Sequence, residues 1–169
     1  WHHIALKGAA EMADLLGYTE DAARYRQTMA RVKDGYNRCW NGYAYRHPSY
    51  HQHTDDRAQA LAVISGIAGE EKYPRILQLF KSQFHASPYF EKYVMEALCV
   101  MGQATYALER TRKRFAEMVD DTNHTTLFEG WGIGEREFGA GTTNHAWSGC
   151  AQTVTARHIC GIATPEPGY

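Results

Sequence analysis

The residues with the greatest capacity for chemistry lie between Asp120 and Trp147, in a segment that lacks helical periodicity. Acidic side chains are interleaved there with glycines and aromatic residues. Aromatic rings offer flat apolar faces that suit the C–H surface of a sugar ring, and carboxylates accept hydrogen bonds from hydroxyl groups or transfer protons. Glu129 lies between Phe128 and Trp131, so we expect its carboxylate to face an apolar wall. For a loop glutamate considered alone, a structural cap or an ion pair is the more common role.

Histidine clusters raise the question of a metal site. His2 and His3 are adjacent, and His51 and His53 flank one glutamine. The sequence has neither the HExxH motif nor a comparable helical spacing, and loop histidines more often donate hydrogen bonds than bind metal. Glycine-rich phosphate loops and nucleophile elbows are also absent from the sequence. We therefore expect neither a metal ion nor a cofactor, and the cellular compartment is left open.

Helical hairpins are expected to position these residues. Apolar residues recur at helical spacing through most of the chain, and no alternating segment of strand length stands out. This pattern predicts an all-α protein with helices at residues 4–16, 19–36, 56–68, 70–84, 87–101, 104–118 and 147–160. Thr19 and Ser87 are the expected start signals of two of these helices. Short turns at Gly17, Gly66 to Gly69 and Gly102 make successive helices antiparallel, which predicts a stack of helical hairpins.

The two long connections, residues 38–55 and 120–146, fall at the end of the stack opposite to the glycine turns. Long loops without regular structure are uncommon inside compact domains, and they are usually functional or disordered. Both connections are rich in Trp, Tyr, Phe and His, which argues against disorder. The functional face should therefore lie at the long-loop end.

The overall composition excludes several classes of protein. The 169 residues are 44% hydrophobic and 22% charged, which is enough for one domain with a core. A formal net charge of −1 with interspersed signs leaves no basic stripe for nucleic acid. No apolar run approaches the roughly 20 residues that cross a bilayer. The first residues, Trp1 to Ile4, do not have the pattern of a signal peptide and lack an initiator methionine, so we expect the chain to be part of a longer polypeptide.

Two motifs and one helical segment resemble a known family. The motifs are TTLFEGW, residues 125–131, and NHAWSG, residues 144–149; the segment is TDDRAQALAVISGIAG, residues 54–69. With the helices between them, they resemble the C-terminal half of the catalytic domain of bacterial α-L-rhamnosidases, from about Thr54 to Gly161. The two motifs at this separation are fairly specific, whereas either helix pattern alone is not. The resemblance implies an (α/α)6 toroid, in which six helical hairpins surround a pocket, and hydrolysis of a terminal α-L-rhamnosyl bond with inversion.

The same resemblance implies roles for four residues. Glu129 in TTLFEGW matches the general base that activates water. His145 in NHAWSG matches a residue that contacts the sugar. Trp131 and Trp147 are implied as walls of the pocket by their closeness to the motifs.

The family's general acid lies in an acidic motif further upstream, and nothing in this sequence matches it. Three hairpins also cannot close a ring of six, so residues 1–169 are expected to be the C-terminal portion of a larger catalytic domain. The implied partners are a rhamnosyl glycoside and the rest of that domain. Alone, the chain is expected to be inactive and to self-associate through the apolar surface that an open ring leaves uncovered.

Other interpretations stay open on the sequence alone. If Glu129 is not the base, then Asp120, Asp121 and Glu135 are the next candidates. A helical-repeat scaffold that binds a protein or peptide would share the stacked hairpins but would have a mobile 120–146 loop. A lyase, or a six-hairpin glycosidase for another sugar, would share nearly every feature, because fold does not settle substrate.

Overall fold

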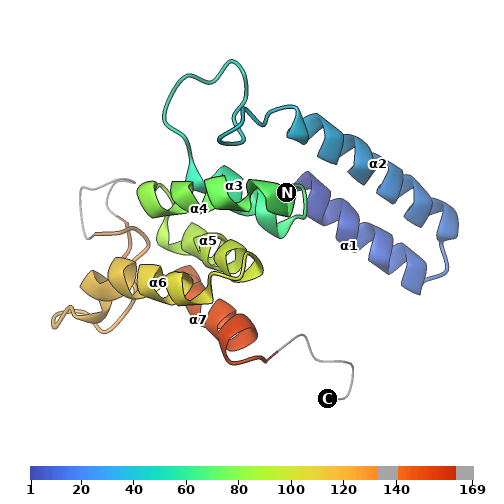
Figure 1. Ribbon diagram of the computed structural model, residues 1–169. Coiled ribbons are helices and arrows are strands. Elements are labelled where there is room, and N and C mark those ends of the chain that lie inside the picture. Colours follow the sequence, from blue (N-terminus) through green and yellow to red (C-terminus); the bar gives the residue numbers. More distant parts are fainter. Residues whose placement is uncertain (133–140, 163–169) are drawn as a thin grey trace.

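The computed structural model describes residues 1–132 and 141–162, and Figure 1 shows that they are mainly helical. The helices are α1 (His2–Leu15), α2 (Thr19–Asn37), α3 (Asp56–Ile64), α4 (Tyr73–Ser82), α5 (Pro88–Val100), α6 (Ala104–Val119) and α7 (Cys150–Val154), and the short turns are η1 (Glu70–Lys72), η2 (Ala146–Gly149) and η3 (Thr155–Ile159). The described residues form no β-strand, although Trp40 and Tyr45 pair in an isolated bridge. The predicted all-α fold is confirmed. In these two ranges, no helix is both long and apolar enough to cross a membrane.

Three glycine turns fold the first six helices into antiparallel pairs. Gly17, Gly66 and Gly102 have φ values of 77°, 73° and 72°. This left-handed conformation ends a helix, and only glycine adopts it without a steric cost. α1 packs on α2, α5 packs on α6, and α3 and α7 both pack on α5. Figure 1 shows the three turns toward the right and the described parts of the two long connections toward the left, so these parts lie opposite to the turns, as predicted.

The observed helix ends differ from the predicted ones most clearly at residues 147–160. Periodicity predicts one helix there, whereas the structure has η2, α7 and the π-helical η3 in succession. Thr155 Oγ1 donates a hydrogen bond to Ala151 O at 3.1 Å, and such side-chain bonds compete with regular helix. Ser87 is the N-cap of α5 as predicted, because its Oγ accepts from Phe90 N at 3.3 Å. Thr19, by contrast, is already the first residue of α2 and caps nothing with its side chain.

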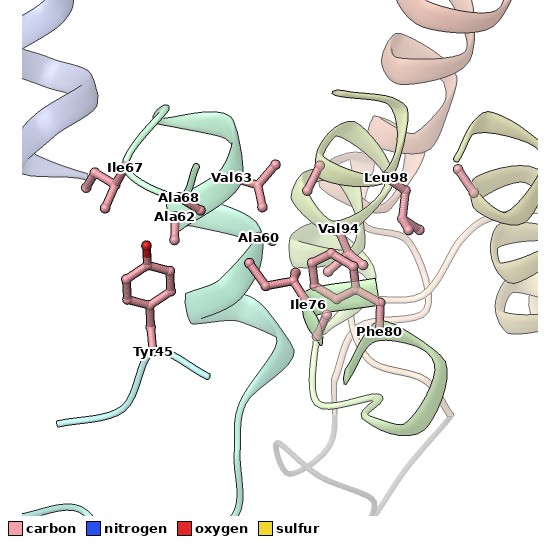
Figure 2. Close-up of a cluster of buried hydrophobic side chains, with 13 residues drawn as sticks. Tyr45, Ala60, Ala62, Val63, Ile67, Ala68, Ile76, Phe80, Val94 and Leu98 are labelled. Carbon is pink, nitrogen blue, oxygen red and sulfur yellow. The ribbon is translucent and has the colours of Figure 1, made fainter. Parts of the chain in front are cut away.

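The main hydrophobic core lies between α3, α4 and α5 (Figure 2). Phe80 of α4 shares this cluster with Val94 and Leu98 of α5, and all three are fully buried. Two of the α3 side chains in the cluster, Ala60 and Ala62, are alanines, which allow close packing of the neighbouring helices. Gln59, also buried in α3, attaches the first long connection: it accepts from Tyr45 N at 2.8 Å and donates to Tyr45 O at 2.9 Å.

A set of charged side chains is buried beside this core. Arg110 of α6 donates to Asp56 Oδ2 at 2.8 Å and to Glu91 Oε1 at 2.5 Å, and each of these side chains is at most 1% exposed. The same guanidinium donates to the carbonyl oxygens of Phe80 and Gln83 at the end of α4. We call Asp56, Glu91 and Arg110 the buried ion cluster. Because an unpaired buried charge is strongly unfavourable, the cluster fixes α3, α5 and α6 relative to one another.

Candidate active site

Three hydrogen bonds hold the backbone around Glu129. His145 N donates to Leu127 O at 2.9 Å, and Glu129 N donates to Thr142 O at 2.9 Å. Ser148 Oγ, which is buried, donates to Phe128 O at 2.6 Å. The Phe128 side chain is itself buried in a small cluster with residues of α6. These contacts bring the two motifs of the sequence together and fix the position of Glu129.

The Glu129 carboxylate is accessible and well supplied with donors. Its Oε2 accepts from Thr142 N at 3.1 Å and from Thr142 Oγ1 at 3.3 Å, and it lies 3.7 Å from His145 Nδ1. The side chain is 31% exposed, so water reaches it. The backbone N–H of Thr142, helped by the nearby His145 and the Thr142 hydroxyl, holds the pKa of Glu129 below its ordinary value. The carboxylate is therefore ionised at neutral pH.

Aromatic rings continue from this carboxylate across the N-terminal end of α5. The centroids of the His145 and Trp147 rings are 4.1 Å apart, and those of Trp147 and Tyr89 are 5.2 Å apart. Tyr89 and Tyr93 share a hydrogen bond between their hydroxyls at 3.0 Å, and Trp1 lies edge-on to Tyr93 at 5.0 Å. We call these five residues the aromatic row. Its exposed members, Trp147 at 41% and Trp1 at 57%, present the kind of apolar face on which a sugar ring stacks.

Trp131 lies apart from this group. Its Nε1 donates to Ala86 O at 2.7 Å, its ring meets that of Phe115 at 5.0 Å, and the Arg114 guanidinium lies 4.1 Å from its centroid. The structure thus brings Glu129, His145 and Trp147 together, whereas the described contacts of Trp131 are with α6 and with the α4–α5 connection. Its role as a wall of the pocket stays a prediction.

Of the other candidate acids, Asp120 and Asp121 lie at the end of α6 and in the turn after it, and Glu135 lies outside the described residues. Asp121 accepts from the backbone N–H groups of Asn123 at 2.7 Å and His124 at 3.2 Å, which lowers its pKa and shapes the turn after α6. Asp120 is the C-cap of α6. Glu135 is one of the residues that the structure does not describe. Across residues 1–132 and 141–162, no three His, Cys, Asp or Glu side chains form a group that could hold a metal ion.

Comparison with known proteins bears on the fold. This chain is similar in structure to the GH78 family rhamnosidase of Bacillus sp. GL1. The match covers 90% of this chain, with a TM-score of 0.70 and 22% sequence identity. The chain shares the helical fold of part of that enzyme. It spans 18% of the length of the Bacillus protein. No family model matches the sequence, and no curated protein matches it.

Four residues of this site were not singled out as functional by the sequence analysis. Thr142 and Ser148 lie within or beside the two motifs, but their roles depend on hydrogen bonds across a loop. Tyr89 and Tyr93 are spaced one helical turn apart, a pattern that indicates a shared helix face. Their common face is recognisable in the sequence, but its closeness to Trp147 is not.

Proposed function

We propose that this chain is part of the catalytic domain of an inverting α-L-rhamnosidase, with Glu129 as the general base. One observation carries the proposal: Glu129 Oε2 lies 3.7 Å from His145 Nδ1, and the His145 ring lies 4.1 Å from that of Trp147. A carboxylate can activate water, and an imidazole and an exposed indole can contact a bound sugar beside it. The structural similarity to a rhamnosidase supports this sugar class.

Glu129 is suited to take a proton from water. Its low pKa keeps it ionised, and its partial exposure admits the water. In the proposed step the water oxygen attacks the anomeric carbon, one water proton passes to Glu129, and the bond to the leaving oxygen breaks. A second carboxylic acid, about 6.5–9.5 Å away, protonates the leaving oxygen in such reactions. We propose that the rest of the catalytic domain supplies this acid.

His145 and Trp147 are the proposed sugar contacts. The imidazole of His145 can exchange hydrogen bonds with a ring hydroxyl, and Trp147 can stack on the C–H face. Thr142 Oγ1 lies 3.0 Å from His145 Nδ1, so the imidazole has a defined orientation beside the carboxylate. This arrangement requires no cofactor.

Two alternatives lead to different observations. A binding scaffold would have a loose 120–146 loop, but the described part of that loop is attached through Ser148 to Phe128 and through Trp131 to Ala86, which favours the enzyme. A related glycosidase or lyase with another substrate fits the same geometry. A screen of aryl glycosides that differ only in the sugar separates these enzymes.

The main test is Glu129→Gln in the polypeptide that contains this chain together with the upstream half of the domain. Turnover of an aryl α-L-rhamnoside should fall by about 10²- to 10⁴-fold, because the amide cannot accept the proton. Glu109→Gln, at an exposed site on α6, is the matched control and should leave turnover unchanged. Near-normal turnover in Glu129→Gln would overturn the assignment of the base.

Two further measurements complete this test. The anomeric configuration of the first product, followed by proton NMR, should be opposite to that of the substrate. The 169-residue chain alone should not hydrolyse the aryl rhamnoside, and measurable turnover would contradict the need for a second half of the domain.

A further inference from the structure

Trp131 connects the candidate base to the helical body of the molecule. It lies two residues after Glu129 and is fixed in three ways: by its hydrogen bond to Ala86 O, by the Phe115 ring and by the Arg114 guanidinium. Phe115 is 6% exposed and belongs to the second hydrophobic cluster. The indole is therefore held on its N–H edge and by two neighbouring side chains, which leaves its backbone little freedom to move.

Arg114 contributes more than a charge to this arrangement. Its Nη2 donates to Ala86 O at 2.9 Å and to Phe84 O at 3.3 Å, and its Nη1 lies 3.2 Å from Glu91 Oε2. Ala86 O thus accepts from both Arg114 and Trp131, so the two side chains are aligned by a shared acceptor. The Arg114 side chain is only 10% exposed. A planar guanidinium is the group that can bond in its plane and stack with its face at the same time.

The buried ion cluster fixes Arg114 in turn. Arg110 lies one helical turn before Arg114 on α6, and both contact Glu91. Arg110 also holds Gln83 O, and Asp56 Oδ1 accepts from His85 N at 3.2 Å. The short connection between α4 and α5 is therefore held by hydrogen bonds to Arg110, Asp56 and Arg114. A rigid path of contacts runs from the buried ion cluster through Arg114 and Trp131 to the backbone beside Glu129.

We infer that Arg114 is a positioning residue for Glu129 and acts through Trp131. The inference rests on the proposed function of Glu129, since it explains how that carboxylate is kept in place. The contacts of Arg114 with Trp131 and with Ala86 O give it an effect on the placement of Glu129 through the backbone of residues 129–131. Loss of the guanidinium would leave the indole held only by Ala86 O and Phe115, so Trp131 and the backbone beside Glu129 would be less firmly placed.

Four variants test this inference: Arg114→Gln, Arg114→Lys, Trp131→Phe and the control Arg112→Gln, at an exposed site on the same helix. In the polypeptide that contains both halves of the domain, Arg114→Gln should lower kcat about 10-fold with KM nearly unchanged, because small misplacements of a reacting group reduce the rate of the chemical step. Arg114→Lys should recover only part of the loss, since lysine lacks the planar fork. Arg112→Gln should behave like the unmodified protein.

The 169-residue chain provides a second readout that does not depend on turnover. In Arg114→Gln the pKa of Glu129, followed by carbon NMR, should rise toward its ordinary value because the contacts with Thr142 loosen. A purely structural role would lower the melting temperature and leave both this titration and kcat unchanged, which would overturn the inference. If Arg114→Gln does not fold, Trp131→Phe tests the same path, because it keeps an aromatic ring but removes the bond to Ala86 O and reduces the contact with Phe115 and Arg114. If Glu129→Gln leaves turnover intact while Arg114→Gln still shifts the Glu129 titration, the proposed base is wrong but the positioning path stands.

Discussion

The buried ion cluster and the Glu129–His145 pair both combine carboxylates with basic side chains, but they differ in their access to water. The buried ion cluster is at most 1% exposed, whereas the side chains of Glu129 and His145 are 31% and 33% exposed. In the first group, Arg110 forms ion pairs with Asp56 and Glu91, so these charges can be buried between helices. In the second group, donors from Thr142 hold the carboxylate, and its side chain stays partly exposed.

The two environments shift carboxylate pKa values in opposite directions. Burial raises the pKa of Asp56, despite the neighbouring Arg110. The backbone N–H of Thr142 lowers the pKa of Glu129 by more than partial desolvation raises it. A carboxylate therefore holds helices together in one place and is the proposed proton acceptor in the other. Between Asp56 and Glu129, exposure and the surrounding donors set the direction of the pKa shift.

The largest effect on stability should come from breaking the buried ion cluster. Arg110→Ala leaves Asp56 and Glu91 without their main partner, and loss of one member of a buried ion pair costs about 3–5 kcal/mol. Arg112→Ala, at an exposed site on the same helix, should change the free energy of unfolding by less than about 0.5 kcal/mol. Urea unfolding followed by circular dichroism measures both. Equal values for the two variants would show that the buried ion cluster does not stabilise the fold.

A smaller effect is expected where the two motifs meet. Ser148→Ala removes the donor to Phe128 O and leaves a buried carbonyl unpaired, which costs about 1–3 kcal/mol. Ser49→Ala is the matched control: it removes an exposed hydrogen bond between the Ser49 hydroxyl and His47 Nδ1 and should have a much smaller effect. The same urea experiment applies, and an unchanged unfolding midpoint in Ser148→Ala would contradict the role given to this hydrogen bond.

The smallest effect concerns the titration of the open site. Thr142→Ala removes the hydroxyl donor to Glu129 Oε2 but keeps the backbone donor, so the pKa of Glu129 should rise only part of the way toward its ordinary value. Because this pKa is lower in the folded than in the unfolded chain, the ionised carboxylate stabilises the fold above the unfolded pKa. That contribution is lost as the pH falls through the folded pKa. Carbon NMR titration measures the change, and Thr105→Ala, on the exposed surface of α6, should not alter the Glu129 titration.

Local patterns in the sequence were sufficient to predict the hairpins. Apolar spacing located the helices, and Gly17 and Gly102 marked turns because glycine readily adopts a positive φ. The cap formed by Ser87 was also predictable, since its partner Phe90 lies three residues away. The division of residues 147–160 into three short helical turns was not predicted, because it depends on packing against α5 and on hydrogen bonds within the segment.

The candidate site was predictable only in part. The motifs pointed to Glu129 and His145, and the structure places these two side chains together. The surroundings of Trp131 and Arg114 could not be derived in the same way, since both contact Ala86, a residue far from them in sequence. Contacts of this kind arise from tertiary packing and leave no periodic signal in the chain.

Arg110 donates hydrogen bonds to four acceptors, so substitutions at Arg110 and at its partners are expected to be coupled during evolution. Its guanidinium serves two carboxylates and two carbonyl oxygens, so a substitution at position 110 alone leaves acceptors unsatisfied on three other helical segments. A coordinated exchange of Asp56, Glu91 and Arg110 for well-packed apolar side chains would avoid unpaired charges, and such replacements are often neutral or stabilising. Related chains are therefore expected to retain these three residues as a set or to replace them as a set.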